Sequence, residues 1–362
     1  MHRTPSRLAT SVLVAASIAL AAAVTGPAAA DAQATPTSTP KPQTITLVTH
    51  DSFAVSTDVL AAFTRRTGIT VKVLQVGDAG QVVNQAILTK DNPLGDVLFG
   101  VDNTFLSRAL DEGIFEPYRS PATDGVPAAL QLDPTDRVTP VDYGDVCINY
   151  DKQWFADRKL AVPRSLEDLT KPAYKGDLVV EDPSTSSPGL AFLLATVQQF
   201  GVKGWQQYWK QLVANDVQVV DGWEQAYYDA FSGGGQGGKR PLVVSYASSP
   251  AAAVVFADPP ITTSPIGTMT QSCFRQVEFA GVLKGTAHRA AARRFVDFML
   301  SSQFQADVPL QMFVYPAVEG TALPKVFTQN ADAAQSPYEM SPTRIGAQRD
   351  GWIRDWTGIV LR

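Results

Sequence analysis

TITLVTHDSFAVSTDVLAAFTRRTGITVKVLQVGDAGQVVNQAILTKDNPLGDVLFGV, residues 44–101, decides the fold of this chain. Short β-rich runs alternate here with segments whose apolar residues recur at helical spacing. This βαβαβ order is typical of a parallel sheet with helices on both faces. The pattern predicts strands over 45–49, 71–76 and 96–101, and helices over 55–66, 82–89 and 104–111.

Polar residues follow two of these strands directly. His50, Asp51 and Ser52 come after the first strand, and Asp102 and Asn103 come after the third. Ligands of open α/β sheets bind beyond the carboxyl ends of the strands. All five residues are therefore predicted to contribute to a ligand pocket.

The rest of the sequence predicts a second series of strands and helices, followed by a segment that returns to the first lobe. A strand over 143–150 leaves the first lobe, and a strand over 276–283 carries the chain back. Two α/β lobes joined by crossing strands describe a hinged clamshell, with a mostly parallel sheet and flanking helices in each lobe. The predicted boundaries are 44–145 for the first part of lobe 1, 146–275 for lobe 2, and 276–362 for the return to lobe 1 and the C-terminal helices.

The N-terminal 43 residues have the composition of an export signal and a linker. A basic start is followed by an apolar run over 8–24 and by Ala28–Ala30, which suits signal peptidase cleavage. A membrane anchor is the competing interpretation, but the run is shorter than the roughly 20 residues that a span needs. We expect a signal peptide over 1–30, a Pro/Thr/Ala-rich linker over 31–43, and a protein exported to the periplasm or another extracytoplasmic space.

The amino-acid composition excludes two classes of binding partner. The formal net charge is −5 and charged residues make up 18% of the chain, without a basic stripe. Nucleic acid and anionic membrane surfaces are therefore not expected partners. About 320 residues remain after the leader, enough for two lobes. We expect a monomer.

The two cysteines, Cys147 and Cys273, lie on or beside the two crossing strands. An even count in an oxidising compartment predicts a disulfide, with two buried free thiols as the alternative. The bridge would then link the two crossing strands of the hinge covalently.

Motifs for catalysis and metal binding are missing. His50 and His288, the histidines left after the signal, have no partner at metal-ligand spacing. The sequence contains no G-x-S-x-G elbow and no H-E-x-x-H pair. We expect no enzyme activity, cofactor or metal, although two acids that converge in space would make a hydrolase.

Two segments, 184–189 and 245–250, place serines before a proline that suits the first turn of a helix. Each could bind an anion at the helix N-terminus, or Ser187 and Ser249 could simply cap it. On the helix predicted over 223–231, Trp223 and Tyr227 share a face, either for core packing or for stacking on a ligand ring. Phe313 could likewise pack in the core or stack on a ligand ring.

In their order along the chain, these stretches resemble the periplasmic thiamine-binding proteins of ABC importers, within the type II solute-binding superfamily. The matching stretches cover nearly all of residues 44–357: Asp51–Phe53, Gly100–Asn103, Asp142–Gly144, Glu181–Pro183, Thr185–Ser186, Pro188–Leu190, Gly222–Glu224, Ala226–Tyr227, Ser245–Tyr246, Ser249–Pro250, Gln276–Glu278, Tyr315–Pro316 and Ala347–Arg349 with Trp352 and Trp356.

The resemblance implies a pocket between the lobes for thiamine, thiamine phosphate or thiamine diphosphate, and delivery to a membrane ABC permease. Trp223 and Tyr246 would hold the rings, Ser186 and nearby backbone N–H groups a phosphate, and Asp102 the cationic or amino-bearing end. The predicted ligand-binding residues are Trp223, Tyr246, Asp102, Ser186, Tyr227, Asp51, Ser52, Asn103, Thr185, Ser249, Phe313 and His50.

Three positions depart from the family pattern. His50 and Ala252 stand where the family has tyrosine, and Phe313 stands where it has tryptophan. Loss of the aromatic ring at 252 removes one face of the expected ring sandwich, a contact of about 0.5–1.5 kcal/mol. Ferric ion, a phosphonate or a polyamine on the same fold therefore stay open as alternative ligands.

Overall fold

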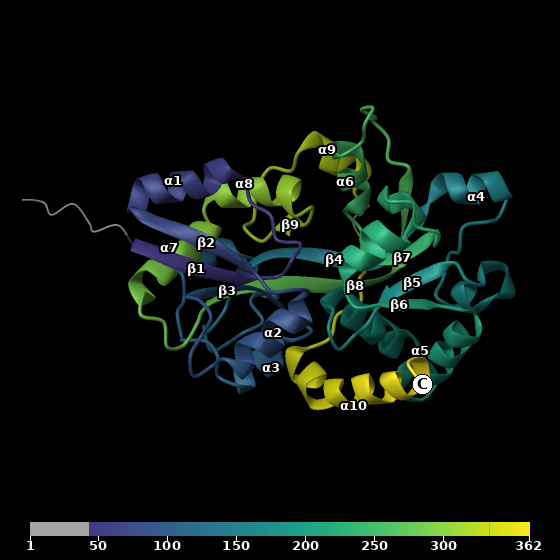
Figure 1. Ribbon diagram of the computed structural model, residues 1–362, viewed down its shortest axis with the longest axis horizontal. Helices are drawn as coiled ribbons and strands as arrows, with labels where there is room; N and C mark the ends of the chain where they lie inside the picture. Colours follow the sequence, from purple (N-terminus) through teal and green to yellow (C-terminus); the bar gives the residue numbers. More distant parts are fainter. Residues whose placement is uncertain (1–42, 333) are drawn as a thin grey trace, which may run out of the picture. The chain divides into compact units, whose positions relative to one another are not determined.

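The computed structural model describes residues 43–332 and 334–362 (Figure 1). The predicted signal peptide over 1–30 lies outside the described residues, as does the predicted linker over 31–43 except Gln43, which opens the first strand. None of the helices in the described ranges is long and apolar enough to cross a membrane.

The βαβαβ unit predicted from residues 44–101 is confirmed. Strand β1 pairs in parallel with β2 on one side and with β3 on the other. Its elements are β1 (Gln43–Thr49), α1 (Thr57–Thr67), β2 (Ile69–Gln75), α2 (Ala79–Leu88), β3 (Val97–Asp102) and α3 (Leu106–Asp111).

The second α/β series also forms, with additions that the sequence pattern did not indicate. The additional elements are α4, β6, α8, β9 and α9, and the segment predicted as an α-helix over 223–231 contains a π-helix. The bounds are β4 (Thr139–Asp151), α4 (Lys152–Arg158), β5 (Leu178–Glu181), α5 (Ser187–Ala214), β6 (Gln218–Val220), the π-helix (Gln225–Ala230), β7 (Leu242–Tyr246), α6 (Ser249–Val255), β8 (Ile266–Val282), α7 (Arg289–Met299), α8 (Ser302–Gln311), β9 (Tyr315–Pro316), α9 (Lys325–Asn330) and α10 (Pro342–Val360).

Glycines in the left-handed region mark two helix ends. Gly68 follows α1 with φ 71° and its N–H bonds to the carbonyl of Thr64, the arrangement of a glycine C-cap. Gly201 interrupts α5 with φ 68°, so the two halves of this helix meet at a kink.

One sheet of nine strands organises the described residues. Its order is β2-β1-β3-β8-β4-β7-β5-β6, and β9 pairs with β4. The longest strands, β4 and β8, run antiparallel side by side through the middle of the sheet (Figure 1). The amino-terminal half of β4 pairs with β9 and its carboxyl-terminal half with β7, while the carboxyl-terminal half of β8 pairs with β3. These two strands connect the β1–β3 part of the sheet to the β5–β7 part.

Helices bury both faces of this sheet. Helices α1, α7 and α8 pack their apolar residues on one face of the β1–β3 part. On the other side, α2, α3, α5 and α10 enclose a larger cluster that includes Trp209 and Trp356, in edge contact at 5.4 Å. This cluster is continuous from β3 to β7, and the described residues form one compact unit. The predicted lobe boundaries stay a prediction.

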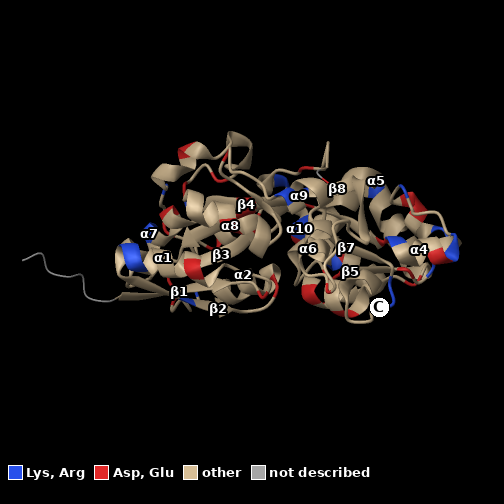
Figure 2. Cartoon of the chain, turned by 90° about the horizontal axis from the view of Figure 1, so that it is seen from above, with Lys and Arg blue, Asp and Glu red and all other residues tan. Residues whose placement is uncertain are grey.

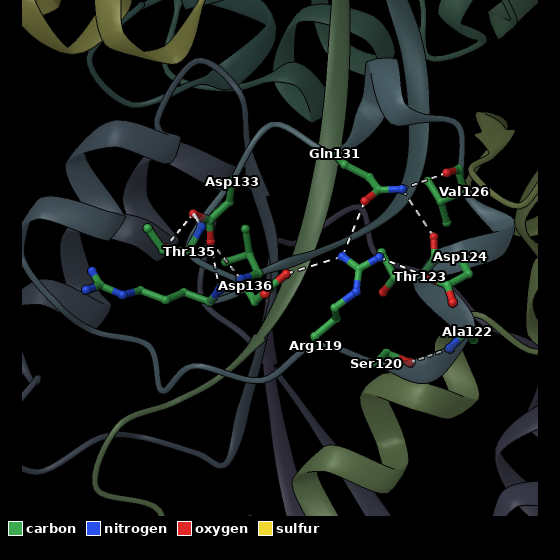
Figure 3. Close-up of polar contacts among 12 residues, drawn as sticks. Arg119, Ser120, Ala122, Thr123, Asp124, Val126, Gln131, Asp133, Thr135 and Asp136 are labelled. Carbon is green, nitrogen blue, oxygen red and sulfur yellow. Dashed lines mark hydrogen bonds and ion pairs between the residues drawn. The ribbon is translucent and has the colours of Figure 1, made fainter.

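The long connection from α3 to β4 contains two short 3-10 helices, Pro121–Gly125 and Ala128–Leu130, and is held by polar contacts (Figure 3). Arg119 donates to Asp124 at 2.8 Å and to Asp136 at 3.3 Å. The Asp133 carboxylate accepts backbone N–H groups of Thr135 at 2.9 Å and Arg137 at 2.7 Å. These contacts fix the direction in which the chain enters β4.

Cys147 on β4 and Cys273 on β8 form the predicted disulfide. Both cysteines are buried, and they lie where the pairing of β4 with β8 shifts register between Val146 and Ile148. The bridge joins the two central strands at the point where their hydrogen-bonded ladder is interrupted.

We expect removal of this disulfide to destabilise the protein markedly. The cysteines are 126 residues apart, and a bridge that closes a long loop restricts the unfolded chain, with typical losses of about 2–5 kcal/mol on removal. The double variant Cys147→Ala/Cys273→Ala should therefore unfold at a lower urea concentration than the parent. An unchanged midpoint would contradict the structural role of the bridge.

Candidate ligand-binding site

A cavity of about 290 Å³ opens where the loops after β1, β7 and α8 meet the π-helix. Its walls come from segments that are far apart in the sequence. The lining residues are His50, Asp51, Ser52, Phe53, Ala54, Trp223, Glu224, Tyr227, Tyr228, Tyr246, Ser249, Ala252, Phe256, Glu278, Gln311, Met312, Phe313 and Val314.

Aromatic rings form one wall of the cavity. The ring of Trp223 stacks on Tyr227, with centroids 5.0 Å apart and planes 21° apart. It meets Tyr246 edge-on at 6.3 Å, and its indole N–H donates to Ser245 Oγ at 2.9 Å. Trp223 is therefore fixed in orientation while one part of its surface remains in the cavity. Such rigid aromatic surfaces suit a flat ring or a cation.

The Tyr227 hydroxyl is buried and has no hydrogen-bond partner among the described residues. Burial raises the pKa of Tyr227, so the phenol stays protonated at physiological pH. A buried hydroxyl without a partner is costly, and a ligand acceptor in the cavity would relieve that cost.

The charged residues of the cavity wall are acidic. Asp51, Glu224 and Glu278 line it, and the lining includes no lysine or arginine. Figure 2 shows lysine and arginine residues on helices such as α4 and α7, which do not line this cavity. Burial raises the pKa of Asp51 and of Glu224. An acidic, aromatic cavity favours a cationic ligand.

His50 forms the floor of the cavity in the neutral state. Its Nδ1 lies 3.0 Å from Ser52 Oγ, and its Nε2 lies 3.5 Å from the Glu278 carboxyl. The ring packs against Phe99 with centroids 5.7 Å apart. Burial lowers the pKa of His50 to about 4, so the imidazole is uncharged at physiological pH. The left-handed Gly100 is required here, because a Cβ at that position would lie 2.3 Å from the imidazole ring.

Asp78, at the start of α2, connects the first part of the chain to both helical segments that flank the cavity. Its carboxylate accepts N–H groups of Ala79 at 2.6 Å, Trp223 at 3.0 Å and Ser187 at 3.3 Å. Burial raises its pKa to about 6 even though these donors favour the charged form. Asp78 therefore holds the Trp223 backbone against the β1–β3 part of the sheet.

Of the twelve residues predicted to bind ligand, eight line the cavity: His50, Asp51, Ser52, Trp223, Tyr227, Tyr246, Ser249 and Phe313. Ser249 Oγ lies 2.8 Å from Ser245 Oγ and accepts the Tyr246 N–H. Phe313 has a left-handed φ of 54°, and Ser248 donates to its carbonyl. A bulky residue held in this strained conformation is typical of a functional site.

The other four predicted residues lie outside this cavity. Asn103 bonds to the backbone of Arg275 and Val277, and Thr185 bonds to the Asp221 carbonyl. Ser186 is fully buried and caps α5 by accepting the Gly189 N–H. The cap of α5 is thus Ser186 and not Ser187, the alternative that the sequence suggested. Similarly, the residue before α6 is Ser248 and not Ser249.

Asp102 is the fourth of these residues, and it is completely enclosed. One carboxylate oxygen accepts from Thr104 Oγ1 at 2.6 Å and from the Thr104 N–H at 3.0 Å. The other accepts from Gln276 Nε2 at 2.5 Å and from Ser187 Oγ. Asp102 is fully buried and its oxygens are occupied, so it orients Ser187 and Gln276.

Sequence reasoning missed three acids that matter here. Glu278 lines the cavity, Glu224 flanks Trp223, and Asp142 lies behind Glu278. Glu278 could have been found from its strand, because it lies two residues from Gln276 and so faces the same side of the sheet. Contact between Asp142 and Glu278 depends on the register of β4 against β8, which sequence alone does not supply.

Asp142 and Glu278 are register partners and form a carboxyl pair. Apart from Glu278, the oxygens of Asp142 have no hydrogen-bond partner in the described part of the chain. Burial raises the pKa of Asp142 to about 7, and burial together with the neighbouring carboxyl raises that of Glu278. Two carboxyls in one buried site hold a proton between them.

We expect Asp142→Asn to stabilise the protein more at alkaline than at acidic pH. The pKa of Asp142 in the folded state lies above its ordinary 3.8, so the folded state binds the proton more tightly. This contribution to stability is present at low pH and is lost as the pH rises through about 7.

Thermal unfolding at about pH 5 and about pH 8 checks this, because asparagine cannot ionise. The difference in Tm between Asp142→Asn and the parent should be more positive at the higher pH. Asp124→Asn, an exposed carboxylate paired with Arg119, is the control and should show no such trend. The opposite trend for Asp142→Asn would contradict the assignment of the proton.

The nine-stranded mixed sheet, the two long crossing strands and the cavity beside them define a solute-binding protein of the type II periplasmic-binding-protein fold. The chain belongs to the family of bacterial extracellular solute-binding proteins, whose model matches residues 92–339. This is a family of binding proteins and not of enzymes, in agreement with the sequence-based expectation.

Individual relatives cover almost the whole chain. The thiamine-binding periplasmic protein of Salmonella typhimurium is 30% identical over 326 residues, covering 88% of this chain and 94% of its own. The thiamine-binding periplasmic protein of Escherichia coli is 29% identical over the same shares. Among solved structures, a periplasmic thiamin binding protein superposes with a TM-score of 0.78 at 28% identity, over 88% of this chain and 96% of its own.

Proposed function

We propose that this protein binds thiamine outside the cytoplasm and delivers it to an ABC transporter. The observation that carries the proposal is the composition of the cavity: stacked aromatic rings and three carboxyl groups, without a lysine or arginine. Thiamine combines a flat aminopyrimidine with a permanently cationic thiazolium ring. Both parts match such walls, through stacking and cation–π attraction. The relatives named thiamine-binding proteins support the same ligand.

The charge of the cavity bears on the phosphorylation state of the ligand. Phosphate groups would be repelled by Asp51, Glu224 and Glu278 unless backbone N–H groups compensated. We therefore propose that thiamine binds at least as tightly as its phosphates. A phosphate, if present, would point toward the open side of the cavity and not toward Glu278.

For transport, we propose a monomer of two lobes, 44–145 with 276–362 and 146–275, that close on the ligand about β4 and β8. Three contacts support closure across this boundary. Asp78 accepts N–H groups from Ser187 and Trp223, and Gly80 packs so closely on the Thr185 carbonyl that a Cβ there would lie 2.5 Å away. The closed form would then dock on the membrane permease.

The alternative ligands have less support. Ferric ion would require tyrosinate ligands, yet burial raises the pKa of Tyr227, and the rings of Tyr227 and Tyr228 are turned 85° apart. A phosphonate would face the same carboxyl groups that disfavour phosphate. A hydrolase is outside the activity of the family.

Titration calorimetry on the mature, refolded and ligand-stripped protein tests the proposal directly. Thiamine should bind with a submicromolar Kd, and thiamine diphosphate no more tightly. A folded protein that gives no heat with either compound would refute thiamine as the ligand. Panels of ferric ion, phosphonates and polyamines would then follow on the same preparation.

A variant of Trp223 separates a binding role from a core role. We expect Trp223→Ala to weaken thiamine binding at least about tenfold, since the rigid aromatic surface for stacking is lost, with a Tm close to that of the parent. Trp154→Ala removes a half-buried tryptophan of α4 outside the cavity and should leave binding unchanged. A large drop in Tm with unchanged affinity in the folded fraction would assign Trp223 to the core.

A further inference from the structure

Three carboxyl side chains lie in a row across the centre of the sheet. Asp102 on β3 is opposite Glu278 on β8, and Glu278 is opposite Asp142 on β4. Residues directly opposite on neighbouring strands project from the same face. The row therefore runs beneath the cavity, at the strands that connect the two parts of the sheet.

Only the middle member of the row reaches the cavity. Glu278 lines the 290 Å³ cavity and also a small extension of about 30 Å³ beside Asp78 and Ser187. Asp102 and Asp142 are both fully buried. Since the oxygens of Asp102 are taken up by Thr104, Ser187 and Gln276, a ligand cation in the cavity would meet Glu278 and not Asp102.

The groups that face this row offer no positive charge to compensate it. Asp142 faces Glu278 from β4; Asp102 and Asp78 act on Glu278 from β3 and α2. Tyr246 faces it from β7 as a phenol, and His50 faces it from the loop after β1 as a neutral imidazole. Within the described residues, neither Asp142 nor Glu278 forms an ion pair with lysine or arginine. A proton on the pair supplies the missing positive charge in the empty site.

We infer that Glu278 contacts the cationic part of the ligand, and that the ligand's positive charge replaces the proton shared by Asp142 and Glu278. The proton passes to the solvent as the ligand enters, so the charge buried beneath the cavity is unchanged. This inference rests on the proposed function, because it requires a cationic ligand such as thiamine.

The affinity for the cationic ligand then depends on pH. A cation beside Glu278 favours the ionised pair and lowers its pKa in the complex, so affinity rises with pH until the free protein has lost the same proton. The increase is at most about tenfold per pH unit for one proton released. His50 does not supply this proton, since it is already neutral in the free protein.

Calorimetry of thiamine binding near pH 7 in phosphate and in Tris tests the inference on the unmodified protein. The two buffers differ in ionisation enthalpy, so the apparent binding enthalpy must differ between them if a proton is released. We expect a release of about half a proton per thiamine at pH 7, because a pKa of about 7 leaves Asp142 half protonated in the free protein. In Glu278→Gln the release should vanish and thiamine should bind about tenfold more weakly or worse.

Glu116→Gln is the matched control, because Glu116 is a buried glutamate paired with Arg289 and outside the cavity. It should release the same proton as the parent. Thiamine binding with the same enthalpy in both buffers, or an unchanged release in Glu278→Gln, would overturn the inference while leaving the proposed function intact. No thiamine binding by the folded parent would overturn both.

Discussion

The pairing of β4 with β8 is the constraint on which the rest of the structure depends. The two strands stay paired from Thr139 with Ala280 to Asp151 with Ile266, and every other part of the sheet is added to one of them. Their shared register brings Asp142 opposite Glu278, and the disulfide joins them where the ladder is interrupted. A slip of one residue by either strand would turn the carboxyl of that strand to the opposite face and separate Asp142 from Glu278.

The same pairing explains why so many ionisable groups are buried in one place. The cavity lies where the two parts of the sheet meet, and acids from β3, β4, β5, α2 and β8 converge there: Asp102, Asp142, Glu181, Asp78 and Glu278. Burial raises the pKa of each of them. Such a cluster destabilises the empty protein at neutral pH. A cation bound in the cavity would offset part of the loss in stability that this cluster of acids causes.

Local patterns in the sequence were enough to predict the helices and strands, but not the buried carboxyl groups beneath the cavity. The βαβαβ order and the disulfide followed from periodicity and an even number of cysteines. The loop after β1 was placed at the pocket by its position at the end of a strand, whereas Trp223 was placed there by the family resemblance. The role of Glu278 depends on strand register, and the enclosure of Asp102 depends on hydrogen bonds from Thr104, Ser187 and Gln276, neither of which has a local signal.

The π-helix was missed for a related reason. Its composition, with Tyr227 and Tyr228 in sequence, is compatible with an ordinary α-turn, and the wider turn is set by what it packs on. Trp223 is held at its backbone by Asp78 and at its indole N–H by Ser245. Trp223 is thus fixed by residues from two distant parts of the chain, and Tyr227 stacks on it.

Ala252 has two phenylalanine neighbours in the wall of the cavity. Ala252 lines the cavity from α6, so the side where the related family has a tyrosine is open. Phe256, one turn further along α6, is 68% exposed and meets Phe313 edge-on at 5.3 Å. Exposure of a phenylalanine to this degree is unfavourable unless something covers it. Phe256 and Phe313 therefore place an aromatic surface in the cavity wall beside Ala252.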